Sequence, residues 1–252
     1  MKTKKFNYKA LTLIGLLGML TSFNTYAVET SGNVGVYSKY ILRGIAVEND
    51  NASVQGGVDV NFDNGFYLGW WASNLGYTHN TTLGETYSTN GFENDFYGGY
   101  TGSIGSWFGY TVGLIQYYYL SVDDSDLTEL VLAADFKYVT LQGQYLINDG
   151  AWGNSGDIYW TVSGDYDIPR DFNIGFSLGY YTYDDDDAGN SKKIWTKTTE
   201  SSAFRHLNIS ASHPIGKTGA NMGLTYIIAG DDREGVSYDN TMVLDLTYDF
   251  DI

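Results

Sequence analysis

The sequence contains no cysteine and only two prolines among its 252 residues. The lack of cysteine excludes a disulfide scaffold and any thiolate metal site. The low proline content argues against a soluble β-sandwich, whereas 23 tyrosines and 31 glycines are typical of long strands with aromatic girdles. A secreted soluble β-domain is kept as the alternative fold.

Basic residues are also scarce, with 14 Lys and Arg against 30 Asp and Glu and a net charge of −16. Four of the lysines stand in the first nine residues, before an apolar run that ends at Leu20 and a small or polar stretch that ends at Ala27. This order predicts a secretory signal peptide over residues 1–27. The remaining chain, residues 28–252, is more acidic still, which excludes a nucleic-acid partner because phosphate binding needs basic surface.

Long hydrophobic runs are missing, since no segment approaches the roughly 20 consecutive apolar residues that a transmembrane helix needs. Apolar residues alternate with polar ones instead. In "GVDVNFDNGFYLGWWASN", residues 57–74, two alternating runs flank Asn64 and Gly65, a pair typical of a tight hairpin turn. A period of two over this length indicates strands that separate two environments.

Twelve such runs are predicted as strands, most of them with the roughly 9–11 residues that a tilted strand needs to cross a bilayer core. Their predicted spans are 33–44, 52–62, 66–77, 92–102, 107–120, 128–136, 139–147, 158–168, 172–183, 204–213, 220–229 and 240–252. The connections alternate between short turns, such as "DNG" and "PRD", and longer, mostly acidic loops. This pattern predicts an all-β fold, an antiparallel transmembrane β-barrel of about 12 strands in one domain.

The parity of each strand assigns its faces. In "FNIGFSLGYYTY", residues 172–183, large apolar side chains occupy one face, while Asn, Gly and Ser alternate with them on the other. Charges fall on the second face, as the cost of a charge that faces lipid requires. We therefore expect hydrocarbon outside the barrel and a polar lumen inside.

The inward face is predicted to carry many more acids than bases. The acids are Asp59, Glu93, Asp95, Glu129, Asp135, Asp165, Asp167, Asp245, Asp249 and Asp251, and the bases are Lys39, Arg43 and Lys137. Carboxylates raise the local cation concentration and repel anions, so this lumen predicts a preference for cations at low salt. Arg43 is the candidate constriction residue, and the alternative is that it pairs with a neighbouring acid and locks the barrel wall.

Tyrosines and a tryptophan share the inward parity. They are Tyr37, Tyr67, Trp71, Tyr97, Tyr117, Tyr119, Tyr159, Tyr181 and Tyr183. One interpretation is a track that stacks on or hydrogen-bonds small polar solutes. The other is that a small barrel fills its interior with side chains that can satisfy their own hydroxyl groups.

Few residues suggest catalysis or metal binding. His206 and Ser210 lie four residues, roughly 13 Å, apart along one strand, too far for a nucleophile and its base. The acidic stretch from Asp184 to Glu200 has the wrong spacing for a twelve-residue calcium loop. We therefore expect neither an enzyme nor a metal or cofactor site.

Several short motifs together resemble the TorF family of porins. They are Ser38, Tyr40, Arg43 and Gly44; Gln55, Gly56 and Gly57; Gly65, Phe66, Tyr67, Gly69 and Trp71–Asn74; "DFYGGYTG" at 95–102; and "TEL" at 128–130. The similarity spans most of the chain after residue 27 and is densest in its first third. It implies an outer-membrane barrel with channel function and no particular substrate. Unlike many outer-membrane barrels, the chain continues past Phe250 to Ile252.

Two functional hypotheses follow. The first is a narrow passive channel for small hydrophilic solutes or cations, located in the outer membrane after Sec-type export. The second is a plugged structural or interaction barrel whose acidic external loops bind a partner or surface cations. In both, the expected partners are outer-membrane lipid and lipopolysaccharide, with the barrel assembly machinery acting during insertion.

Overall fold

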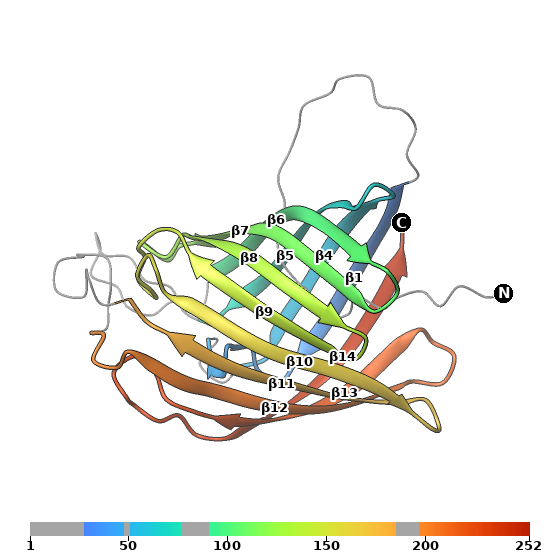
Figure 1. Cartoon of the computed structure of the whole chain (residues 1–252). Coiled ribbons are helices and arrows are strands. Elements are labelled where there is room, and N and C mark those ends of the chain that lie inside the picture. Colours follow the sequence, from blue (N-terminus) through green and yellow to red (C-terminus); the bar gives the residue numbers. More distant parts are fainter. Residues whose placement is uncertain (1–27, 48–50, 77–90, 185–196) are drawn as a thin grey trace.

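The chain folds into a closed antiparallel barrel in the computed structural model, which describes residues 28–47, 51–76, 91–184 and 197–252 (Figure 1). The described barrel strands number 12, which confirms the predicted fold. They are β1 (Val28–Tyr37), β4 (Ser53–Phe62), β5 (Phe66–Leu75), β6 (Gly91–Ile104), β7 (Phe108–Leu120), β8 (Leu127–Phe136), β9 (Val139–Leu146), β10 (Ile158–Ile168), β11 (Phe172–Thr182), β12 (Ser202–Pro214), β13 (Ala220–Ala229) and β14 (Thr241–Asp251). Two short strands, β2 (Ile41–Leu42) and β3 (Ile45–Ala46), form a separate sheet.

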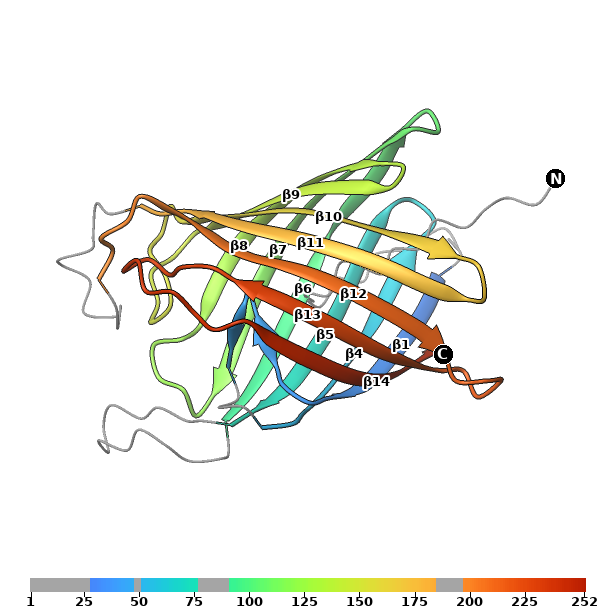
Figure 2. The same cartoon turned by 90° about the horizontal axis from the view of Figure 1, so that it is seen from below.

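The barrel closes where the first and last strands meet. β1 pairs with β14 from Ser31 opposite Asp251 to Tyr37 opposite Asp245, and Figure 2 shows the two strands side by side. Every other barrel strand pairs with its neighbour in the chain, so the sheet has no free edge. Backbone N–H and C=O groups are therefore paired without help from solvent, as a bilayer requires.

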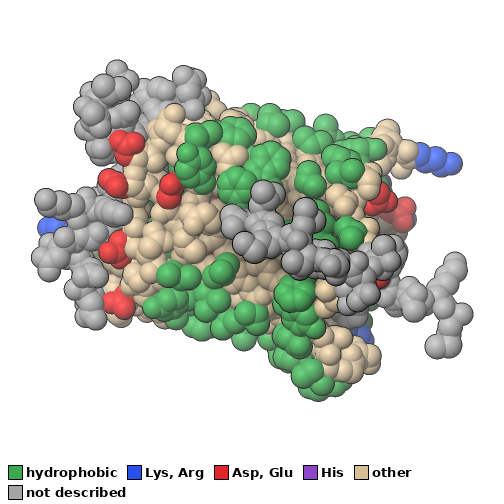
Figure 3. Space-filling view, turned by 90° about the horizontal axis from the view of Figure 1, so that it is seen from above, with side chains coloured by type: hydrophobic (Ala, Val, Ile, Leu, Met, Phe, Trp, Pro, Cys, Tyr) green, Lys and Arg blue, Asp and Glu red, His purple; other side chains and the backbone are tan. Residues whose placement is uncertain are grey.

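The two faces of the wall follow the predicted alternation. On β11, Phe172, Ile174 and Phe176 are exposed on the outer surface, whereas the intervening residues are less exposed. Figure 3 shows hydrophobic side chains over the outer wall and acidic ones toward its two ends. Among the described ranges, no helix is long and apolar enough to cross a bilayer.

Short and long connections lie at opposite ends of the barrel. The turns after β4, β6, β8, β10 and β12 gather at the end that also holds the carboxyl terminus (Figure 1). Glu93, Asp95 and Glu129 stand near the beginnings of strands that enter from long loops. Asp59 and Asp135 stand near the short turns. The lumen thus carries acids at both ends.

The predicted first strand, 33–44, is wrong at its carboxyl end. β1 ends at Tyr37, and the chain reverses at Arg43 and Gly44, whose φ angles of 49° and 84° build a tight two-residue turn between β2 and β3. Lys39 and Arg43 are therefore not strand residues. The apolar residues of this small hairpin continue the alternation of β1, which is why the pattern resembled one long strand.

Lys137 lies in the turn between β8 and β9, where the predicted spans 128–136 and 139–147 leave it, and its φ is 52°. Its ammonium group sits 4.5 Å from the centre of the Tyr138 ring. Its charge therefore lies at the short-turn end of the barrel, outside the strands.

The outer wall generates a test of lipid contact. Ile209, near the middle of β12 and 47% exposed, faces outward, whereas Ser210 next to it faces the lumen. We expect Ile209→Arg to lower the free energy of unfolding in lipid bilayers by about 2–4 kcal/mol, the cost of an arginine at mid-bilayer depth. Ser210→Arg is the matched control and should cost less. Equal losses in a urea-unfolding titration in liposomes would contradict the assignment of the faces.

Candidate functional site

Residues 38–47, here called the constriction hairpin, fold from the wall into the lumen. Tyr40 is 5% exposed, and its ring centre lies 5.5 Å from that of Trp71 on β5. The backbone N–H of Val47 donates to the carbonyl of Tyr40 at 3.0 Å, which closes the base of the hairpin. Leu42 and Val47 pack against a cluster of buried lumen side chains. The hairpin therefore narrows the half of the lumen nearer the long loops.

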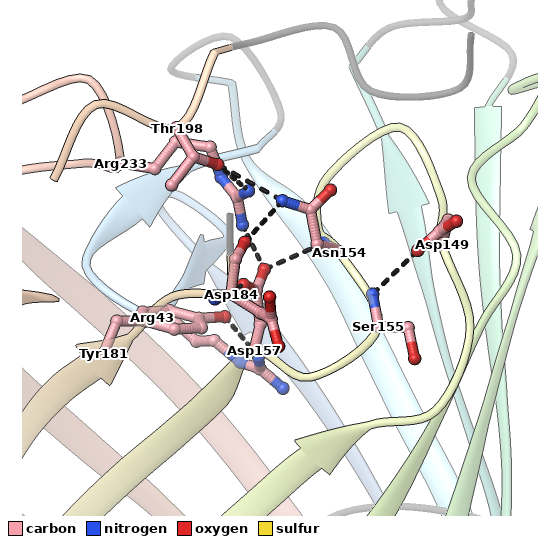
Figure 4. Close-up of polar contacts among 9 residues, drawn as sticks. All are labelled: Arg43, Asp149, Asn154, Ser155, Asp157, Tyr181, Asp184, Thr198 and Arg233. Atoms are coloured by element: carbon pink, nitrogen blue, oxygen red, sulfur yellow. Dashed lines mark hydrogen bonds and ion pairs between the residues drawn. The ribbon is translucent and has the colours of Figure 1, made fainter. Parts of the chain in front are cut away.

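Arg43, at the tip of this hairpin, binds the opposite wall. Its Nη2 donates to Glu129 Oε2 at 2.6 Å and to Gln144 Oε1 at 2.9 Å. The same nitrogen donates to the Tyr117 hydroxyl at 3.0 Å, and Nη1 donates to the Tyr181 hydroxyl (Figure 4). The guanidinium carbon lies 4.4 Å from the centre of the Tyr159 ring, a cation–π distance.

These contacts join the hairpin tip to five consecutive strands, β7 to β11. The predicted pairing of Arg43 with an acid that locks it to the wall is therefore present, whereas its role as the constriction residue stays a prediction. Both partners are largely buried, with side chains 13% and 3% exposed for Arg43 and Glu129. Charge-assisted bonds in such surroundings are stronger than at a surface.

Gly44 makes this close approach possible. A Cβ added there would lie 2.8 Å from the carbonyl oxygen of Arg205 and 2.9 Å from the Cβ of His206, both on β12. Its positive φ also disfavours any other residue. The hairpin thus touches the wall on both sides of its tip.

The other predicted lumen acids fall into two groups. Glu93, Asp95 and Glu129 are at most 2% exposed and lie beside the constriction hairpin. The second group is more exposed and stands mainly toward the short turns or in the middle of the barrel: Asp59, Asp135, Asp165, Asp167, Asp245, Asp249 and Asp251. Lys39 is half-buried at the start of the hairpin.

Polar neighbours hold members of the second group in place. Asp59 accepts a hydrogen bond from the Tyr97 hydroxyl. Asp135 accepts one from the Thr140 hydroxyl at 2.6 Å, and Asp165 accepts one from Asn173 at 3.0 Å. These carboxylates remain at least partly exposed, so they can act on ions in the half of the lumen nearer the short turns.

Several inward tyrosines use their hydroxyl groups within the barrel. Tyr119 donates to Glu93 at 2.8 Å, and Tyr117 donates to Glu129 at 2.9 Å. The Tyr159 hydroxyl lies 2.6 Å from His206 Nε2. This geometry favours the interpretation that tyrosine fills the interior over that of a free stacking track.

Sequence parity missed Arg205. The pairing of β11 with β12 shifts between Gly179 and Tyr180, and this bulge leaves Arg205 and His206 both buried although they are adjacent. Arg205 donates to the Asp231 carbonyl at 2.9 Å and lies 5.2 Å from the centre of the Tyr238 ring. A bulge has no clear period-two signal, so the sequence offered no sign of this second inward arginine.

A cluster between the long loops, here called the loop clasp, joins three connections (Figure 4). Arg233 after β13 forms an ion pair with Asp157 before β10, and Arg233 Nη1 donates to the Thr198 hydroxyl at 2.9 Å. Asn154 Nδ2 donates to the Asp184 carbonyl at 2.8 Å. Burial raises the pKa of the Asp157 carboxyl above its ordinary value, and the Arg233 guanidinium opposes that shift.

The remaining sequence predictions concern metals, catalysis and export. Within the described ranges, no group of three or more His, Asp or Glu side chains could hold a metal ion. The histidine considered for catalysis, His206, is hydrogen-bonded through Nε2 to the Tyr159 hydroxyl. The signal peptide over 1–27 and most of the acidic stretch at 185–196 lie outside the described residues, so both predictions about them stay open.

Comparisons with known proteins give one family and several solved porin structures of similar fold. A family model described as a bacterial protein of unknown function, Gcw_chp, matches residues 23–243. The solved KdgM porin is 12% identical over 87% of this chain and 99% of its own, with a TM-score of 0.53. The KdgM porin in complex with disordered oligogalacturonate is 11% identical over 88% and 99%, with a TM-score of 0.50.

None of the curated proteins matches the sequence. At 11–12% identity, the similarity to KdgM structures concerns the fold alone. The family match does not confirm the resemblance to the TorF family, which stays a prediction.

The loop clasp generates a second test. We expect Arg233→Ala to leave the Asp157 carboxylate buried without its partner, a change that costs roughly 3–5 kcal/mol in a buried ion pair. The long loops should then open locally, and proteinase K should cleave them faster. Arg170→Ala, in the exposed turn between β10 and β11, is the control. Cleavage as slow as in the unchanged protein would mean that the clasp does not hold the loops.

Proposed function

The chain belongs to the Gcw_chp family of bacterial proteins of unknown function, and we propose that it is an outer-membrane porin-like channel. It allows passive diffusion of small hydrophilic solutes and prefers cations. The observation that carries this proposal is the excess of inward carboxylates over inward bases along the lumen as a whole, to which the partly exposed Asp59, Asp135, Asp165, Asp245 and Asp249 contribute most. No catalytic step is part of the proposed function.

The outer wall supports a location in the outer membrane. Exposed apolar side chains alternate with less exposed residues on strand after strand, and the closed sheet leaves no unpaired edge. A closed barrel of this kind satisfies its backbone within lipid. The proposed partners are outer-membrane lipid, lipopolysaccharide and the barrel assembly machinery, with export through the Sec pathway.

The lumen supports the preference for cations. Asp59, Asp135 and Asp165 carry negative charge in the half of the lumen near the short turns, which the proposal places on the periplasmic side. Carboxylates at a pore entrance attract cations and repel anions, an effect that weakens as salt shortens the screening length to about 10 Å or less.

The alternative function is a plugged structural or interaction barrel. One observation favours it: the constriction hairpin and its buried cluster fill much of the lumen near the long loops. A twelve-strand barrel stands between small barrels filled with side chains and large open porins, so barrel size does not decide between the two functions.

Planar-bilayer recording of the refolded barrel separates the two functions. We expect discrete current steps and, in a gradient of dilute KCl, a reversal potential of the sign that cation preference gives. The same preference should decrease at about 1 M salt, where the screening length is roughly 3 Å. Absence of current at every voltage would favour the plugged barrel, and anion preference at low salt would refute the proposed selectivity.

Arg43 provides the most local test of the constriction. We expect Arg43→Ala to raise single-channel conductance and strengthen cation preference, because it removes the positive charge and the contacts that hold the hairpin against β7 to β11. Lys217→Ala, in an exposed short turn, removes a positive charge away from the hairpin and serves as the control. If Arg43→Ala and Lys217→Ala conduct alike, the hairpin does not limit the current.

A further inference from the structure

We propose that Glu93 and Asp95 form an occluded binding site for one desolvated monovalent cation, an alkali-metal ion or ammonium, beneath the constriction hairpin. The inference rests on the proposed function, because it assigns to the proposed cation-preferring lumen a place where a cation is bound. It stands on the burial of the two carboxylates and on oxygen atoms that the surrounding protein leaves without a partner.

The two acids occupy neighbouring inward positions of β6. Glu93 lies opposite Ser73 on β5 and Tyr119 on β7, and Asp95 lies opposite Trp71 and Tyr117. Glu93 and Asp95 are each 0% exposed. The pair is therefore enclosed by the wall on both sides and by the hairpin across the lumen.

Three carboxylate oxygens of the pair have no hydrogen-bond partner among the described residues. They are Glu93 Oε2 and both Oδ1 and Oδ2 of Asp95. Glu93 Oε1 accepts the hydroxyl of Tyr119 at 2.8 Å. Buried polar atoms in folded proteins are nearly always paired, so three such oxygens on adjacent side chains point to a ligand.

The charges lead to the same conclusion. Among the basic groups of the described residues, Arg43 interacts electrostatically with both Glu93 and Asp95. Its guanidinium already forms an ion pair with Glu129. Glu129, Glu93 and Asp95 thus share a single arginine. A buried carboxylate without a counter-charge is strongly unfavourable, and a bound cation would remove that penalty.

The donor set favours a small monovalent ion. A calcium ion takes six to eight oxygen ligands, more than two carboxylates supply, and no third acid or histidine completes a metal-binding group in the described ranges. An ammonium ion could donate N–H groups to the three oxygens, and an alkali-metal ion could bind them directly. Both ions share the same chemistry, a compact single positive charge.

Aromatic rings surround the pair. Trp71, Tyr97 and Tyr117 are at most 6% exposed, and Tyr40 of the constriction hairpin packs on Trp71. Ring faces attract cations, and because both acids are fully buried, a cation bound to them would lie out of contact with bulk solvent. The Tyr40 hydroxyl is hydrogen-bonded to the Glu93 carboxylate, so the hairpin itself covers the site, and Asp95 is the acid of the pair whose two oxygens both remain without any partner.

Thermal unfolding of the refolded, detergent-solubilised protein tests the site without requiring current flow. The midpoint Tm is measured at neutral pH and constant ionic strength in KCl, NH4Cl and the chloride of the bulky N-methylglucamine cation. A ligand that binds the folded state alone stabilises it, so we expect Tm to rise by roughly 2–4 °C in K⁺, in NH4⁺ or in both, relative to N-methylglucamine. The comparison of K⁺ with NH4⁺ identifies the preferred ion.

Near-isosteric variants localise the effect. We expect Asp95→Asn and Glu93→Gln each to abolish the cation-dependent rise in Tm, whereas Asp135→Asn, a lumen acid bonded to Thr140, retains it. The inference is overturned if Tm is the same in all three salts or if Asp135→Asn loses the rise as well. It is also overturned if Tm rises only when the pH is lowered and not when K⁺ or NH4⁺ is added, since a proton would then neutralise the pair.

The outcome is separable from that of the channel proposal. A protein that conducts with cation preference but has no cation-dependent Tm keeps its proposed function and loses this site. A protein that conducts no current but is stabilised by K⁺ or NH4⁺ through Asp95 keeps the site and loses the channel function.

Discussion

Closure of the sheet between β1 and β14 is the constraint on which the rest of the structure depends. Once every strand has two paired neighbours, the backbone needs no solvent, and the wall can face lipid on one side. Closure also creates an interior with a limited cross-section. Every side chain that points inward must fit into that space, so the sizes and charges of the inward residues determine how open and how charged the lumen is.

The interior is filled unevenly along the barrel axis. Near the long loops, the constriction hairpin inserts Tyr40 and Arg43 among buried tyrosines and acids. Near the short turns, the inward residues are smaller or more exposed. Arg43 ties the narrow half together, because one guanidinium bonds side chains from β7, β8, β9 and β11 and stacks on a ring of β10. Charge, packing and pore width therefore depend on the same ten residues, 38–47.

The sequence predicted the barrel wall well and its interior insertions poorly. Alternation is enforced at every residue by the difference between lipid and lumen, so the runs around Phe172 and Phe66 indicated both strand and face. The hairpin at Arg43 and Gly44 continues the same alternation, so the pattern alone predicts it as part of the first strand. The bulge at Arg205 changes parity through a single extra residue. Both features depend on contacts with distant strands, which a local pattern does not contain.

The central claim is that solutes pass the constriction hairpin at Arg43. The protein has no cysteine, so Arg43→Cys would place its only thiol at this position. Single-channel current is recorded while a thiol reagent that carries a trimethylammonium group is added. The account predicts an irreversible stepwise fall in current when the thiol reacts, because added bulk and positive charge obstruct a narrow cation path. Unchanged current through channels whose thiol is fully modified by mass spectrometry would contradict it.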